Sequence, residues 1–217
     1  MPENTEQMRA WMGAFGREYT DRNTLAMDEM EALYKRNYGV TRTELNQRFL
    51  ERIPLSAHIL EVGSNIGNQL LCLQNIGFLN LCGIEAQGYA VEISSSRTRH
   101  MTLIQGSAFN IPFRDNCFDL VFTSGLLIHI NPYGLHKAME EIHRCTKEYI
   151  WGFECYADRL TNVMYRGHDN LMWKTDYVRL YLDLFSDLEL IKEERLNYLD
   201  NGNIDSMFLL RKEELAV

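Results

Sequence analysis

Apolar residues recur along the chain with two different periods. From residue 3 to residue 52 they return every three or four positions, as Met8, Trp11 and Phe15 do, which is the spacing of one helix face. From His58 onward, short apolar runs that end in a polar residue alternate with amphipathic segments. Such alternation predicts parallel strands that are joined by right-handed helical crossovers.

The apolar runs also place the strands and helices. Five strands are expected at residues 58–62, 79–84, 101–105, 117–123 and 149–153, and two more begin at residues 188 and 206. Helices are expected at residues 66–76, 88–96, 132–145 and 175–184. The sequence therefore predicts an α/β fold, with a doubly wound, mostly parallel, Rossmann-like sheet of about seven strands and an N-terminal helical cap.

The chain is expected to divide into two parts. Residues 1–54 form an N-terminal helical cap or lid, and residues 55–217 form the α/β domain, which irregular aromatic sequence interrupts at about residues 155–175. Within the cap, residues 15–23 (FGREYTDRN) lie between two expected helices. This segment is either a solvated connector or a lid whose side chains reach a ligand.

Composition limits the possible functions. The chain has 217 residues, of which 46% are hydrophobic and 24% are charged, and this suits one domain with an appendage. A formal net charge of −8 argues against non-specific binding to nucleic acid or to an anionic membrane. Five cysteines without a closely spaced pair indicate reduced thiols and no metal site. Because neither a signal peptide nor a spanning segment is recognisable, we expect a cytoplasmic protein.

One segment, His58 to Gly67 (HILEVGSNIG), combines a buried strand with a glycine-containing turn. Gly63 and Gly67 allow a tight turn and a close approach of a ligand to the backbone, and Asn65 stands where a further glycine is common. In open α/β sheets, ligands bind beyond the carboxyl ends of the strands. The turn is therefore a candidate binding edge, and a turn without a ligand is the alternative.

Three further positions fall at the same edge of the expected sheet. Glu85 ends the second strand, about twenty residues after the turn, where a carboxylate can accept hydrogen bonds from both hydroxyls of a ribose. A surface acid is the alternative. Ser107 and Ala108 follow the third strand and leave room for a flat adenine. Gly125 and Leu126 follow the fourth strand and would lie under the middle of the ligand.

These segments resemble the class I S-adenosylmethionine-dependent methyltransferases over about residues 55–155. EVGSNIG corresponds to the first motif of that family, and IPFRDNCFDLVFTSGLLIHI corresponds to its fourth-strand block. Asn65 replaces a glycine, and Ser107 replaces the more usual Asp. The resemblance implies S-adenosylmethionine as the cofactor. The residues that it assigns to cofactor binding are Glu61, Gly63, Ser64, Asn65, Gly67, Glu85, Ala86, Gln87, Ser107, Ala108, Gly125 and Leu126.

The flanking sequences are similar to the methylases that are associated with pseudaminic acid biosynthesis, through FGREYTDRN, LLIHINP and YRGHDN. This resemblance implies methyl transfer to an oxygen or nitrogen atom of a small molecule, such as a nonulosonic or nucleotide-activated sugar. The expected partner is that small-molecule acceptor, without nucleic acid or membrane, and the chain is expected to be a monomer or a homodimer. Two alternatives stay open, namely an NAD(P)-dependent oxidoreductase and a non-catalytic binding protein of the same fold.

Candidate catalytic and acceptor-binding residues lie outside the glycine turn. His129 can titrate near neutrality and is a candidate base, and a structural histidine is the equal alternative. Tyr19 is the second candidate catalytic residue, because it would close with Arg22 over the cofactor or acceptor. The Arg22 guanidinium could hold a carboxylate or phosphate. The candidates from the irregular segment, for which core packing is the alternative, are Tyr156, Tyr165, Arg166, His168 and Trp173.

Overall fold

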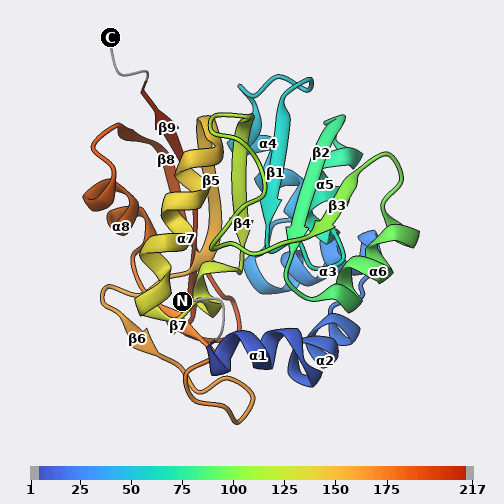
Figure 1. Ribbon diagram of the computed structural model, residues 1–217, viewed down its shortest axis with the longest axis vertical. Coiled ribbons are helices and arrows are strands. Elements are labelled where there is room, and N and C mark those ends of the chain that lie inside the picture. Colours follow the sequence, from blue (N-terminus) through green and yellow to red (C-terminus); the bar gives the residue numbers. More distant parts are fainter. Residues whose placement is uncertain (1–4, 214–217) are drawn as a thin grey trace.

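The computed structural model describes residues 5–213, and its centre is a seven-stranded sheet of order β3-β2-β1-β4-β5-β9-β8 (Figure 1). The strands are β1 (His58–Val62), β2 (Asn80–Glu85), β3 (Thr102–Gln105), β4 (Phe118–Ser124), β5 (Thr146–Cys155), β8 (Leu188–Asn197) and β9 (Ile204–Lys212). Strands β1 to β5 are parallel, whereas β9 runs antiparallel to both β5 and β8. The mostly parallel α/β sheet that the sequence predicts is confirmed.

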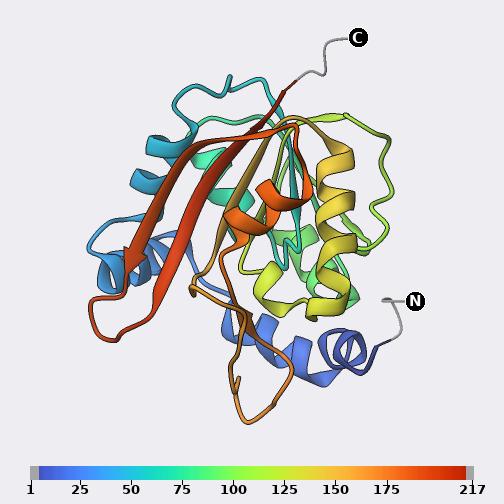
Figure 2. The same ribbon diagram turned by 90° about the vertical axis from the view of Figure 1, so that its left-hand side faces the viewer.

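Helices cover both faces of this sheet. Helices α4 (Arg42–Leu50) and α5 (Asn68–Asn75) pack on one face, and α7 (Pro132–Cys145) and α8 (Tyr177–Leu184) pack on the other. Helix α3 (Met27–Tyr38) contacts α4 and α5, and α6 (Gly88–Arg97) lies against β2 and β3. Figures 1 and 2 both show α1 (Glu6–Met12) and α2 (Ala14–Arg22) lying across one end of the sheet.

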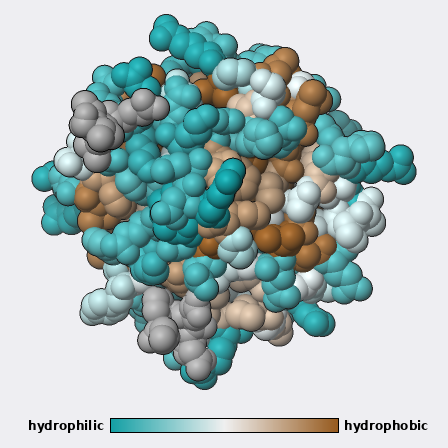
Figure 3. All heavy atoms as spheres, turned by 45° about the horizontal axis from the view of Figure 1, so that its top comes forward, coloured by the Kyte–Doolittle hydropathy of each residue, from teal (hydrophilic) through white to brown (hydrophobic). Residues whose placement is uncertain are grey.

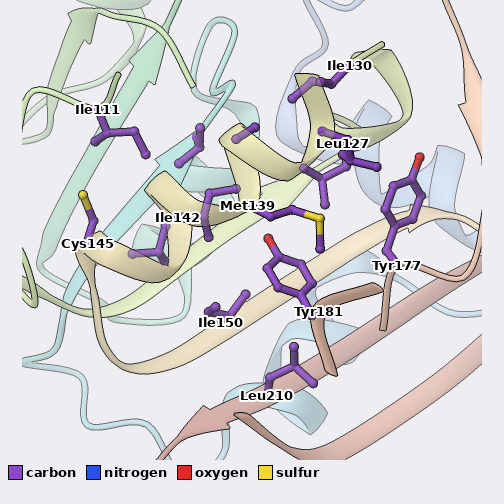
Figure 4. Packing of buried hydrophobic residues seen from close by; sticks show 14 of the residues in the cluster. Ile111, Leu127, Ile130, Met139, Ile142, Cys145, Ile150, Tyr177, Tyr181 and Leu210 are labelled. Atoms are coloured by element: carbon purple, nitrogen blue, oxygen red, sulfur yellow. The ribbon is translucent and has the colours of Figure 1, made fainter. Parts of the chain in front are cut away.

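A hydrophobic core lies on each side of the sheet. Figure 4 shows one of them, in which Met139 and Ile142 from α7 gather with Ile150 from β5 and Tyr181 from α8. Side chains of α4 and α5 pack against the opposite side of the strands. Because apolar side chains cover the central strands on both faces, the carboxyl ends of these strands are held in fixed positions.

The prediction of a connector at residues 15–23 was wrong, because residues 15–22 lie in helix α2 and Asn23 is its C-cap. The chain breaks earlier, at Gly13, which ends α1 and precedes α2. Gly16 lies inside α2, where a Cβ would come within 1.7 Å of the Trp11 carbonyl oxygen. Gly16 is therefore required by the close contact between α1 and α2, and it does not interrupt the helix.

The irregular segment at about residues 155–175 contains a short hairpin. Strands β6 (Thr161–Asn162) and β7 (Trp173–Lys174) pair antiparallel, and an isolated bridge joins Tyr165 to His168 nearer the tip. The hairpin extends beyond the sheet, close to α1 and α2 (Figure 2). The predicted aromatic loop is thus a small two-stranded element.

Apolar side chains on the surface are scattered. Figure 3 shows one face on which hydrophilic residues predominate, with smaller hydrophobic patches between them. Large exposed apolar residues include Leu55, Leu79, Tyr133 and Leu199, and single exposed residues of this kind are usual in soluble proteins. Among the described residues, no helix combines the length and the hydropathy that crossing a membrane requires.

Candidate functional site

A cavity of about 380 Å³ lies between the carboxyl ends of the parallel strands and helices α1, α2 and α3. This volume lies within the range of small-molecule sites, roughly 300–1,000 Å³. The chain order of the strands reverses between β1 and β4, which is where open α/β sheets bind ligands. Twelve of the candidate residues line the cavity: Tyr19, Glu61, Gly63, Ser64, Asn65, Glu85, Ala86, Gln87, Ala108, Gly125, Leu126 and His129.

The turn after β1 is shaped by residues with left-handed backbone conformations. The φ angle is 76° at Gly63 and 45° at Asn65, and Asn tolerates this region better than other non-glycine residues do. The backbone N–H groups of Gly63 and Ser64 donate to the Ile84 carbonyl at 2.9 and 3.0 Å, which ties the turn to β2. A Cβ on Gly63 would lie 2.6 Å from a methyl group of Leu126, so glycine lets the β4 loop approach the turn.

Glu61 ends β1 with a carboxyl group that is not fully paired. Its side chain is 2% exposed, and its Oε2 atom has no hydrogen-bond partner among the described residues. Burial raises the pKa of Glu61 well above its usual value, against the opposing effect of the Arg42 charge. The Ser64 hydroxyl, which is also buried, is unpaired as well. Since buried polar atoms are nearly always paired, these two atoms mark a position for a hydrogen-bonding ligand.

Glu85 is held by the backbone on both of its oxygens. Its Oε2 accepts from the Asn65 N–H at 2.9 Å, and its Oε1 accepts from the Gln87 N–H at 2.8 Å. Burial raises the pKa of Glu85, although these backbone hydrogen bonds partly oppose the rise. A carboxylate has about four acceptor positions, so Glu85 can still accept from a ligand hydroxyl in addition to these backbone donors and Ala86.

Three of the candidate cofactor residues have structural contacts instead. Gln87 lines the cavity, but its amide donates to the carbonyl oxygens of Trp11 and Gly13 at 3.0 and 3.1 Å and so holds the α1–α2 cap. Gly67 precedes α5 and does not reach the cavity wall. Ser107 also lies outside the wall, and its hydroxyl accepts from the backbone N–H two residues later.

The loop after β4 forms a short 3-10 helix, η2 (Leu127–His129), which Glu154 holds in place. The Glu154 carboxyl group at the end of β5 accepts from the N–H groups of Leu126 and Ile128 at 3.1 and 3.3 Å. Glu154 is 1% exposed, and burial raises its pKa to about 7, although these hydrogen bonds partly oppose the rise. Glu154 therefore orients the residues that carry His129, and sequence reasoning did not identify it.

His129 is fixed in one tautomer. Its Nδ1 lies 2.8 Å from the carbonyl oxygen of Leu171, and because a carbonyl oxygen only accepts, Nδ1 carries the proton. The neutral ring then has an unprotonated Nε2. Burial lowers the pKa of His129 to about 4, so the ring is a neutral hydrogen-bond acceptor at neutral pH.

Aromatic rings surround His129 on the cap side of the cavity. The ring centroid of Trp11 lies 4.4 Å from that of His129, and the Tyr165 centroid lies 5.1 Å from it. Tyr19 packs edge-on against Trp11 at 5.3 Å. Burial raises the pKa of Tyr19, so its phenol stays protonated at neutral pH.

None of the candidate acceptor-binding residues lines the cavity. Arg22 lies 3.6 Å from Glu18 on the exposed face of α2. Tyr156 donates to Asp158 at 2.6 Å and lies under the Arg195 guanidinium. The others belong to the hairpin: Tyr165 contacts His129 without reaching the cavity wall, Arg166 and His168 are exposed, and Trp173 is buried.

A second arm of the cavity, which sequence reasoning missed, extends toward β5 and the β8–β9 turn. Its walls include Tyr34 and Tyr38 from α3, Phe153 from β5, and Tyr198 and Asp205 from the β8–β9 hairpin. Adjacent ring centroids are 4.8 to 5.9 Å apart. These residues come from separate parts of the chain and form no sequence motif.

The charged residues that line the cavity are all acidic. They are Glu61, Glu85 and Asp205, and no Lys or Arg from residues 5–213 is part of the wall. A low-dielectric cavity with carboxylates on its wall favours neutral or positively charged ligands over anions.

A comparison with protein families identifies the central part of the chain. Residues 60–149 match the family model described as "Methyltransferase domain". This part of the chain is a methyltransferase domain. The match includes the glycine turn, Glu85 and the β4 loop, all of which meet at the cavity. No match was found among the curated proteins.

Solved structures share the fold of this methyltransferase at low sequence identity. A chain from the complex between the Haloferax volcanii Trm112 methyltransferase activator and its proposed methyltransferase is 14% identical, with a TM-score of 0.69, and 93% of this chain and 97% of that chain are covered. The [4+2]-cyclase SpnF is 15% identical, with a TM-score of 0.64 and coverage of 79% and 81%. A proposed S-adenosylmethionine-dependent methyltransferase from Listeria monocytogenes is 11% identical, with a TM-score of 0.62 and coverage of 78% and 98%.

The cavity fits the cofactor of such methyltransferases. The unpaired Glu61 oxygen is available to a cationic amino group, and Glu85 can still accept from a ribose hydroxyl. Gly63 leaves space for close contact with the backbone, and Ala108 and Phe109 supply an apolar wall for a flat ring. The acidic lining also suits a positively charged sulfonium.

Proposed function

We propose that this methyltransferase transfers a methyl group from S-adenosylmethionine to an oxygen or nitrogen atom of a small molecule that binds in the second arm of the cavity. One observation supports this proposal most strongly. A single cavity runs without interruption from the glycine turn and Glu85 to the aromatic residues of α3 and β5. A bound cofactor and a bound acceptor could therefore meet inside one enclosed space.

The residues of the chain act in this proposal by position and charge. Glu61 accepts from the amino group of the cofactor, and Glu85 accepts from its ribose. The part of the cofactor between these two groups lies against the Gly63 turn. The bound cofactor supplies an already activated methyl group on a positively charged sulfur. The protein therefore has to align the acceptor atom with that methyl group and to exclude water. Helices α1 and α2 cover the cavity and provide the exclusion.

We assign His129 to the acceptor side as a hydrogen-bond acceptor. Its unprotonated Nε2 can orient an acceptor hydroxyl or amine and receive its proton as the methyl group is transferred. The protonated Tyr19 phenol is the matching donor on the cap. Arg22, whose guanidinium faces Glu18, has no part in this proposal.

Two features bear on the acceptor and the compartment. The similarity of the flanking sequences to pseudaminic acid-associated methylases supports an acceptor from nonulosonic sugar metabolism. The acidic wall favours a neutral or amino-bearing form of such a sugar over one that presents a carboxylate or a diphosphate. The five cysteines, all free thiols, support a reducing compartment such as the cytoplasm.

The proposal is tested by calorimetric titration and by turnover. S-Adenosylhomocysteine should bind at the micromolar level, whereas NAD should not bind measurably. A panel of neutral, amino and acidic sugars, together with simple amines, should then be incubated with methyl-labelled S-adenosylmethionine. Tight binding of NAD would favour an oxidoreductase. Binding of S-adenosylhomocysteine without labelling of any acceptor would favour a binding protein or a different reaction.

A further inference from the structure

The second arm of the cavity includes the Asp205 carboxylate, of which only one oxygen has hydrogen-bond partners. The hydroxyls of Tyr38 and Tyr198 both donate to Oδ2 of Asp205, the latter at 3.1 Å. The other oxygen, Oδ1, is buried and has no hydrogen-bond partner by geometry among the described residues. The Cys155 thiol also interacts with the Asp205 carboxylate as a weak donor. Asp205 is 3% exposed and lines the cavity. An unpaired buried carboxylate oxygen at a cavity wall indicates a place for a donor.

Aromatic rings surround this carboxylate. Tyr38 contacts Tyr198 at 4.8 Å and Phe153 at 5.9 Å between ring centroids, and Tyr34 lies 5.7 Å from Phe153. All four rings line the cavity. Aromatic faces and edges next to a carboxylate form the type of environment that binds ammonium groups, through cation–π attraction and charge.

Two of these rings, Tyr34 and Phe153, already contact a cation of the protein itself. The Arg42 guanidinium lies 4.8 Å from the ring centroid of Phe153 and 5.3 Å from that of Tyr34, and it donates to the Tyr34 hydroxyl at 2.9 Å. Arg42 is fully buried and is not part of the cavity wall. Arg42 therefore does not occupy the part of the cavity that Asp205 lines.

We propose that the Asp205 arm is a subsite for an ammonium group, so that the acceptor of this methyltransferase is an amine-bearing or quaternary ammonium compound. This inference rests on the proposed function, and it specifies the substrate class for the same cavity. An ammonium group that carries an N–H donates to Oδ1 of Asp205, whereas a quaternary ammonium group contacts this oxygen by charge alone, and in both cases the rings of Tyr38, Phe153 and Tyr198 surround the group. The group anchors the acceptor, and the atom that receives the methyl group lies toward the glycine turn.

The amino group of the cofactor does not account for the unpaired Asp205 oxygen. Glu61 supplies an unpaired oxygen at the end of β1, next to the glycine turn. Asp205 lies on β9, three strands away in the order β1-β4-β5-β9, which corresponds to about 14 Å between the strands. Two unpaired carboxylate oxygens on strands this far apart fit two separate cationic groups, one on the cofactor and one on the acceptor.

The test compares a cation with its neutral isostere. Choline and 3,3-dimethylbutan-1-ol have nearly the same shape, but only choline is charged. Each is titrated calorimetrically into the protein, both with and without saturating S-adenosylhomocysteine, and N-acetylneuraminic acid is titrated as the acidic sugar. We expect choline to bind roughly tenfold or more tightly than the neutral alcohol. Equal binding of the two, or tighter binding of the acidic sugar, would overturn the subsite.

Variants then place the subsite. Asp205→Asn should reduce the preference for choline to about threefold or less, while the affinity for S-adenosylhomocysteine is unchanged. Asp200→Asn, which makes the same change of charge on an exposed turn, should keep the full preference. An equal loss of S-adenosylhomocysteine affinity in Asp205→Asn would place the cofactor in this arm and overturn the inference.

The two proposals fail in different ways. If S-adenosylhomocysteine does not bind to the wild-type protein, the proposed function is wrong. The titrations of choline and its neutral isostere in the absence of S-adenosylhomocysteine still decide whether the cation subsite exists. If Asp205→Asn does not fold, the comparison of choline with its neutral isostere on the wild-type protein gives the result without a variant.

Discussion

The buried carboxyl group of Glu154 should make the stability of the protein depend on pH. Glu154 lies at the end of β5 with a side chain that is 1% exposed, and its oxygens accept from two backbone N–H groups of the β4 loop. Within residues 5–213, no ion pair joins it to a cation. The variant Glu154→Gln keeps the size of the side chain and removes its ionisation.

The magnitude follows from the pKa of Glu154 in the folded protein. Burial raises the pKa from 4.5 to about 7. Between these values the folded state binds more protons than the unfolded state, so the free energy of unfolding falls as the pH rises. The difference in pKa corresponds to about 3 kcal/mol of stability, which is present below pH 4.5 and lost as the pH reaches 7.

The assay is urea unfolding of the wild type and Glu154→Gln at pH 5, 6, 7 and 8. The stability of the variant relative to the wild type should improve by about 3 kcal/mol over this range, because glutamine cannot ionise. Glu148→Gln, a change at an exposed position on the same strand, should leave the pH dependence unaltered. Parallel curves of unfolding free energy against pH for the wild type and Glu154→Gln would refute the reasoning.

Three further predictions concern the cap, a second buried acid and the acceptor side. Gly16→Ala should separate α1 from α2 and weaken S-adenosylhomocysteine binding about tenfold in calorimetry, whereas Gly202→Ala, where a Cβ meets open space, should not weaken it. Although burial opposes ionisation, hydrogen bonds from Arg144 and other donors lower the pKa of Glu141 to about 2. The ionised Glu141 therefore stabilises the folded protein above about pH 4.5, and this contribution is lost as the pH falls toward 2. Glu141→Gln should therefore lose up to about 3 kcal/mol at pH 7 in urea unfolding and show a weaker acid dependence, and an unchanged unfolding curve would contradict this. Tyr19→Phe should lower kcat by about tenfold at an unchanged affinity for S-adenosylhomocysteine, and equal kcat values would assign Tyr19 a purely structural role.

The sheet and the glycine turn at the cavity could be predicted because local sequence determines them. The strand that ends at Val62 is buried on both faces, and the turn after it needs residues that tolerate left-handed φ angles. Glycine and asparagine tolerate such φ angles in any sequence context, so Gly63 and Asn65 indicate the turn without knowledge of the fold. The position of Glu85 could be predicted because it ends the next apolar run, which forms β2. Such positions depend on the backbone of their own segment and of one neighbouring strand.

The cap was predicted less well, because the same residue types have two possible structural roles. Gly16 lies inside a helix, where glycine usually interrupts the structure, but here it allows two helices to touch. Only the position of Trp11 in space distinguishes these roles. Gln87 has a similar ambiguity, since an amide next to the ribose acid can contact a ligand or, as here, the cap.

The second arm of the cavity is formed by contacts between distant parts of the chain, and for this reason its residues could not be predicted. Asp205 meets Tyr38 across 167 positions of sequence, and the third partner, Tyr198, lies on the opposite side of a hairpin turn. The aromatic residues of the irregular segment attracted attention, but none of them lines the cavity. A fold that is shared with a [4+2]-cyclase does not determine the reaction, so the substrate class has to be inferred from the side chains that meet at this arm. The backbone of the sheet determines the position of the turn that we propose as the cofactor site, whereas the proposed acceptor subsite depends on side chains from separate parts of the chain, among them Asp205 with its unpaired oxygen.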